Sequence, residues 1–117
     1  MEVINIEKAV RLMDGDQELF SDLFEIIENS LPEKYRAIET ALANDSGVDL
    51  ELYAHQLKGA LRNVAAEEVC ATLEKLEKFG AKNDFLSARE IYPKVKPMVN
   101  QVLEYYRSRV WASAFAK

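Results

Sequence analysis

The sequence is poor in the residues from which most catalytic and metal sites are built. It holds one histidine and one cysteine among its 117 residues. These two side chains do not supply the ligands of a usual zinc site. A single cysteine, Cys70, also excludes an internal disulfide, which fits a protein of the reducing cytoplasm.

Several longer signals are missing as well. No apolar run approaches the ~18 residues of a membrane span, and the first residues lack the basic start and apolar core of a secretion signal. The chain has no glycine-rich phosphate loop, and therefore no visible means of binding ATP. Asp14-Gly15-Asp16 lacks the downstream ligands of a calcium loop. A net charge of −5 argues against nucleic acid as a partner.

Helical periodicity dominates what is present. Hydrophobic residues make up 49% of the chain and recur at spacings of three and four, while no stretch alternates like a strand. Short turns between long periodic segments predict an all-α protein, an antiparallel up-and-down four-helix bundle with a short additional N-terminal helix. We expect one domain over residues 1–117, with a core at about 3–108 and with 109–117 as a C-terminal helix end or tail.

Capping residues and helix breakers predict where the helices begin and end. Pro32 should kink or restart the second helix, and Pro93 and Pro97 should bend the last long segment near residues 91–97. The buried seam of that segment is expected to continue through Tyr106 to Val110. The expected N-caps are Asn5, Asp16, Asp49 and Asn83, and the expected closing glycines are Gly15 and Gly80.

The stretch from residue 49 to residue 64 contains the sole histidine, His55. On a helix of 100° per residue, Leu57 marks the centre of the apolar stripe, and His55 lies roughly 160° away, facing outward. Lys58 and Gly59 follow one turn later on the same side. Because glycine inside a helix costs about 1 kcal/mol relative to alanine, an outward Gly59 indicates that something must approach the helix beside the imidazole. This combination favours a phosphoryl group carried on a ring nitrogen.

Each of these residues also has a plainer interpretation. A lone surface histidine is most often a solvated side chain, and Lys58 or Arg62 taken alone would be a solvated charge. Taken alone, Gly59 would also be explained by a close contact with another helix. Leu52, one turn before His55, is either an isolated exposed apolar residue or part of a docking patch.

The run Ala54-His55-Gln56-Leu57-Lys58-Gly59 resembles the signature of the histidine phosphotransfer (HPt) domain of bacterial and plant phosphorelays. The resemblance covers about residues 3–108 and continues through residues 63–66 to Leu76-Glu77. The sequence departs from the family at Ala60, where serine is common, and at Ala65, where glycine is common. Both departures fall on the lining of the expected site rather than on its chemistry.

The resemblance implies a phosphocarrier, with His55 as phosphoacceptor, rather than an enzyme. Lys58 would stabilise the charge of the phosphoryl group. Glu77 either is a carboxylate at the core boundary or touches the imidazole and orients it, as a Gln or Glu at this distance often does in the family. We expect a partner to dock on the outward residues around His55, which are Leu52, Gln56, Gly59 and Arg62.

The implied partners are receiver domains of response regulators and a sensor or hybrid histidine kinase. We expect no cofactor in this chain, a magnesium ion on the partner receiver, and a cytoplasmic monomer that binds neither membrane nor nucleic acid. Two alternatives stay open. In the first, the chain is the phosphoacceptor domain of a chemotaxis-type kinase, although residues 111–117 offer no obvious linker to further domains. In the second, it is an adaptor that binds and blocks a receiver without carrying phosphate. The presence of both His55 and Lys58 argues against the adaptor.

Overall fold

The computed structural model describes residues 2–116, and this part of the chain consists of helices and turns without a strand. The predicted all-α class is therefore confirmed. The helices are α1 (Ile6–Leu12), α2 (Gln17–Ala43), α3 (Gly47–Arg62), α4 (Glu67–Ala81), α5 (Phe85–Ile91), the 3₁₀ turn η1 (Tyr92–Lys94), α6 (Val95–Ser108) and α7 (Ala112–Phe115).

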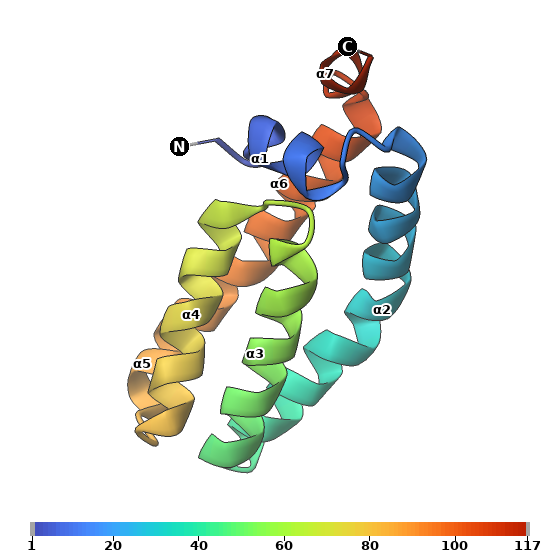
Figure 1. Cartoon of the computed structure of the whole chain (residues 1–117). Coiled ribbons are helices and arrows are strands. Elements are labelled where there is room, and N and C mark those ends of the chain that lie inside the picture. The colour runs from blue at the N-terminus through green and yellow to red at the C-terminus, as the bar shows by residue number, and fades with distance from the viewer. Residues whose placement is uncertain (1, 117) are drawn as a thin grey trace.

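Figure 1 shows α2, α3, α4 and α6 alternating in direction side by side, with α1 lying across one end of the bundle. The turns at residues 44–46 and 63–66 are short, which forces consecutive helices to run antiparallel. The helix α3 lies between α2 and α4 and packs against both. This central position leaves one long face of α3 open to solvent while Leu50, Leu57 and Leu61 on the opposite face are fully buried.

The prolines act much as the sequence predicts. Pro32 lies inside α2 without interrupting it, and Figure 1 shows the helix changing direction along its length. Pro93 lies in the 3₁₀ turn that separates α5 from α6, within the predicted bend, and Pro97 lies in the first turn of α6.

Helix ends at the first two helices follow the prediction. The side chains of Asn5 and Asp16 cap α1 and α2 by accepting hydrogen bonds from the backbone of Lys8 and Leu19. Gly15 between these helices has a φ of 74°, the left-handed conformation expected of a closing glycine.

The predicted end points of α3, α4 and α5 are wrong by a few residues. Ser46, not Asp49, caps α3, and its hydroxyl accepts from the Asp49 backbone. Gly80 lies inside α4, which ends at Ala81. A Cβ atom on Gly80 would approach the backbone nitrogen of Glu51 to 2.8 Å, so this glycine permits close packing of α3 and α4 rather than ending a helix.

The same packing accounts for the start of α3, because a side chain on Gly47 would collide with the carbonyl of Gly80 and with Asn83. Asn83 itself adopts a φ of 56° in the turn, and Asp84 caps α5 in its place.

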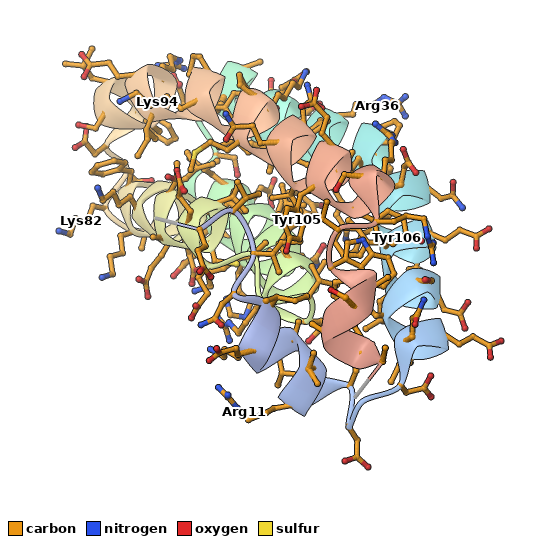
Figure 2. All side chains as sticks on the ribbon, turned by 90° about the horizontal axis from the view of Figure 1, so that it is seen from above. Arg11, Arg36, Lys82, Lys94, Tyr105 and Tyr106 are labelled. Atoms are coloured by element: carbon orange, nitrogen blue, oxygen red, sulfur yellow. The ribbon has the colours of Figure 1, made fainter. Side chains whose placement is uncertain are left out.

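Two aromatic residues near the C-terminus, Trp111 and Phe115, belong to the core. Beyond α6 the chain turns at Arg109, so Val110 leaves the predicted seam and is 64% exposed, whereas Trp111 is 1% exposed. Figure 2 shows Tyr106 between α6 and α2, where its ring stacks on Phe24. Trp111 stacks on the other side of this cluster, and its indole N–H donates to the Tyr106 carbonyl at 2.7 Å.

Candidate functional site

His55 lies near the middle of α3 on the open face of that helix, as the periodicity predicts. Its side chain is 59% exposed, while the Leu57 side chain on the opposite face is completely buried. The alternation follows from the helical repeat alone, because the two residues differ by about 200° around the axis. The imidazole is therefore available to a second protein.

Glu77 of α4 brings the site together. One of its carboxylate oxygens, Oε2, lies 3.2 Å from His55 Nδ1, and the other, Oε1, lies 2.7 Å from Lys58 Nζ. Oε1 is buried and accepts no hydrogen bond of regular geometry, so its contact with Lys58 is an ion pair. A single carboxylate thus joins the imidazole to the ammonium group. Glu77 therefore touches the imidazole, which was one of the two interpretations of this residue.

Lys58 is not placed as expected. The prediction put it on the open face beside His55, but its side chain is only 9% exposed. The physical reason is the approach of α4, which covers this edge of α3 and supplies a counterion for the ammonium group. The apolar stem of a lysine is well suited to such a boundary, where its methylene groups are buried and its charged end meets a carboxylate.

The environment of Glu77 keeps its carboxyl group ionised at neutral pH. Partial burial by itself would raise the pKa of Glu77, but contacts with Lys58 and His55 outweigh burial and hold the pKa below its usual value of 4.5. An ionised carboxylate can only accept a hydrogen bond, so the nitrogen that faces it, Nδ1, carries the ring proton. The tautomer assigned from this contact leaves a lone pair on Nε2.

Gly59 faces open space. A Cβ atom built there would meet nothing within 4 Å, so the interpretation that this glycine relieves a helix contact is wrong. Leu52, Gln56 and Arg62 are likewise exposed, and together with His55 they form a continuous strip along α3.

The sequence did not reveal an open cavity of about 280 Å³ next to this strip. Its charged lining residues come from α1, α3 and α4, three helices that only the tertiary fold brings together. No spacing within one helix signals such a cavity. The charged residues around it are Lys8, Lys58, Arg62, Glu67 and Glu74.

Ala65 lies at the edge of the same cavity, in the turn between α3 and α4. Its φ of 58° falls in the left-handed region that favours glycine. An alanine in this conformation is strained relative to glycine, because its Cβ atom crowds the backbone there. The carbonyl of Ala65 accepts a hydrogen bond from the Asn5 backbone at 2.9 Å, which fixes the start of α1 against the turn.

The exposed histidine beside a carboxylate, on a bundle of long helices, can present a ring nitrogen to a second protein. The family model of the Hpt domain matches residues 7–105, so the chain belongs to the Hpt domain family. Domains of this family take part in histidine phosphotransfer in phosphorelays, interact with kinases and receiver domains, and are phosphocarriers rather than enzymes with a catalytic site of their own.

No curated protein and no solved structure matches the chain. Within residues 2–116, no helix combines the length and the apolar character needed to cross a membrane.

Proposed function

We propose that His55 accepts a phosphoryl group and carries it reversibly between receiver-domain aspartates, or between a sensor histidine kinase and a receiver. The observation that carries this proposal is the contact of 3.2 Å between Glu77 Oε2 and His55 Nδ1 on an exposed ring. It leaves Nε2 unprotonated, and no residue in the range 2–116 forms a hydrogen bond or ion pair with this nitrogen.

Transfer from a receiver is an in-line displacement at phosphorus. The lone pair of His55 Nε2 forms the N–P bond while the P–O bond to the receiver's aspartate breaks, and that carboxylate leaves with the electron pair. The imidazole gains positive charge as the bond forms, and the carboxylate of Glu77 stabilises that charge through the Nδ1 proton. The reverse reaction uses the same groups, because the two phosphoryl bonds are comparable in energy.

Lys58 contributes positive charge to the same site. Its ammonium group shares the Glu77 carboxylate with the imidazole, so it lies one side chain away from the reacting nitrogen. The three equatorial oxygens of the transferring phosphoryl group carry negative charge, which a nearby cation stabilises. The receiver supplies the magnesium ion and the remaining charged groups, since magnesium is usually held by carboxylates together with phosphate oxygens.

The partner docks on the strip formed by Leu52, Gln56, Gly59 and Arg62. All four lie on the open side of α3, and the missing side chain at Gly59 lets another protein approach the helix backbone beside His55. In this proposal the chain acts as a monomer in the cytoplasm and holds no cofactor of its own.

The test is phosphoryl transfer from a phosphorylated receiver domain. The protein should gain one label that acid removes and alkali spares, as a phosphoramidate does. His55→Gln should abolish the label while leaving the helical circular dichroism unchanged, because the ring makes few contacts in the bundle. Gln101→Ala, which changes an exposed glutamine of α6 outside the docking strip, serves as the matched control and should still be labelled.

Label that persists in His55→Gln would place the phosphoryl group on another residue. Tight binding of a receiver without any label in the wild type would favour the adaptor instead.

A further inference from the structure

The cavity beside the His55 strip gathers unlike charges from three helices. Lys8 of α1 and Lys58 and Arg62 of α3 contribute cations, and Glu67 and Glu74 of α4 contribute carboxylates. Its volume of about 280 Å³ is enough for one or two side chains of another protein, and Arg62 belongs both to its lining and to the strip.

The three cations are not equally engaged. Lys8 pairs with Glu67 at 3.3 Å, and Lys58 pairs with Glu77 at 2.7 Å. Arg62 is exposed and makes no side-chain hydrogen bond or ion pair with any residue in the range 2–116. Its guanidinium group is therefore the cation of this cavity that a visiting anion can bind without breaking an existing pair.

The two carboxylates of the cavity, Glu67 and Glu74, also differ in whether they have a partner. Glu67 accepts from Asn5 and Lys8, and these contacts hold the pKa of Glu67 below its usual value. Glu74 lines the same cavity and makes no ion pair within residues 2–116, so its negative charge opposes the binding of a visiting anion at Arg62.

Arg62 is close enough to His55 for one docked partner to cover both residues. The two residues are separated by two helical turns on one face of α3, a rise of roughly 10 Å. A standard interface covers about 800 Å² on each partner, which corresponds to a disc of roughly 16 Å radius. A protein that brings its phosphoryl group to Nε2 of His55 therefore also covers the cavity.

We propose that this cavity is a docking subsite that accepts an acidic side chain of the partner receiver, held by the guanidinium group of Arg62. The inference rests on the proposed function and deepens it. A planar guanidinium matches a carboxylate with two parallel hydrogen bonds, which a lysine does not.

Charge complementarity supports this occupant. The chain carries a net charge of −5, so the protein as a whole repels a partner with an acidic site. A local cation without a partner gives the receiver one favourable orientation on α3. Rim charges of this kind act mainly on encounter and orientation, which are properties of docking rather than of the chemical step.

The test measures the transfer rate against the concentration of phosphorylated receiver, with the full chain. Arg62→Gln should raise the half-saturating concentration roughly three- to tenfold and leave the plateau rate unchanged. Glu74→Gln should lower the half-saturating concentration, because it removes the opposing carboxylate. Added salt should narrow the difference between wild type and Arg62→Gln, since salt screens surface charges.

Lys94→Gln is the matched control. It removes the same charge from η1, on the opposite side of the bundle from Arg11 and α1 (Figure 2). An equal shift in Lys94→Gln would mean that net charge alone is responsible, and the proposal would fail.

The proposal would fail equally if Arg62→Gln lowered the plateau rate and left half-saturation unchanged. Absence of transfer in the wild type with every receiver tried is a different result, because it overturns the carrier function itself.

Discussion

At the scale of single residues, the site depends on one carboxylate that serves two partners. Glu77 holds the proton on His55 Nδ1 with one oxygen and neutralises Lys58 with the other. The two roles are linked, because a change that removes the carboxylate releases the imidazole and at the same time leaves a largely buried ammonium group without a counterion. Stability and transfer chemistry therefore meet at this side chain.

Glu77→Gln should destabilise the bundle at pH 7 by about 1–3 kcal/mol, the range for leaving a buried polar group without its partner. The folded pKa of Glu77 is lower than its unfolded value near 4.5, so its contribution is complete above 4.5 and is lost as the pH falls through the folded pKa. The difference in unfolding free energy between wild type and variant should therefore shrink below pH 4.5. Urea titrations at several pH values measure it.

The control for this prediction is Glu74→Gln. Glu74 is an exposed carboxylate one turn away on the same helix and has no ion pair within residues 2–116. Its replacement should change the unfolding free energy by less than about 0.5 kcal/mol. A wild-type advantage over Glu77→Gln that stayed constant from pH 7 to pH 3 would show that charge at Glu77 does not stabilise the fold.

The sequence predicted the position of His55 well and that of Lys58 badly, and the reason is geometric. His55 lies almost opposite the centre of the buried stripe, so no plausible packing of α3 would bury it. Lys58 lies only about 100° from Leu57, at the boundary of the stripe, where the neighbouring helix decides the burial. Which side α4 would cover is a long-range property that the pattern of one helix does not contain. The cavity at Arg62 was missed for the same reason.

At the scale of helices, two glycines on facing elements have opposite roles. Gly59 on α3 has no atom within 4 Å of where a Cβ would lie, whereas a Cβ on Gly80 of α4 would lie 2.8 Å from the Glu51 nitrogen and 3.1 Å from the Gly47 carbonyl. Gly59→Gln should therefore stabilise the protein by up to about 1 kcal/mol through helix propensity. Gly80→Ala should destabilise it by about 1–3 kcal/mol through overpacking. Thermal unfolding of the two variants tests both signs.

The stabilised variant should be the poorer phosphocarrier. A glutamine at position 59 adds bulk one turn from His55, where a receiver has to reach the backbone, so Gly59→Gln should slow transfer sharply while raising the melting temperature. Gly59→Ala, which adds one methyl group, should lie between it and the wild type. If Gly59→Gln transferred at the wild-type rate, the open space at this position would have no role in docking.

Helix type and order were predictable because the apolar repeat is strong in every long segment. The end points of α3 and α4 were harder to predict from the sequence. Within the sequence, Ser46 and Asp49 are both good capping residues, and Gly47 and Gly80 both resemble helix breakers. Their assignment depends on the close approach of α3 to α4, which requires both glycines inside helices. Single-helix patterns lack this information, since an open glycine and a packed one have the same sequence signal.

At the scale of the whole molecule, the bundle is closed at its α1 end by residues beyond the matched part of the chain. The family model ends at residue 105, but Tyr106, Trp111 and Phe115 form an aromatic cluster with Phe20 and Phe24 of α2. Trp111 and Phe115 are buried, and α7 contacts α1. Within the segment expected to be a C-terminal helix end or tail, Trp111 and Phe115 thus belong to the core, because the turn at Arg109 brings these aromatic residues back onto the bundle.

This closure should matter for stability and not for transfer. Trp111→Ala removes a buried indole that packs on Phe20 and Tyr106, and should cost about 3–5 kcal/mol, enough to lower the melting temperature by roughly 10 °C or more. Below that temperature the variant should carry phosphate at the wild-type rate per folded molecule, because the α3–α4 contacts that orient His55 do not include α7.

Val110→Ala is the matched control, because Val110 directly precedes Trp111 and its side chain is exposed. Truncation of Val110 should leave both stability and transfer unchanged. Measurement of transfer at low temperature, where both variants are folded, separates the two effects. If Trp111→Ala slowed transfer per folded molecule at this low temperature, the aromatic cluster would be coupled to the His55 face through α1 or α2. The site would then depend on the whole bundle rather than on the α3–α4 pair that holds Glu77 against the imidazole.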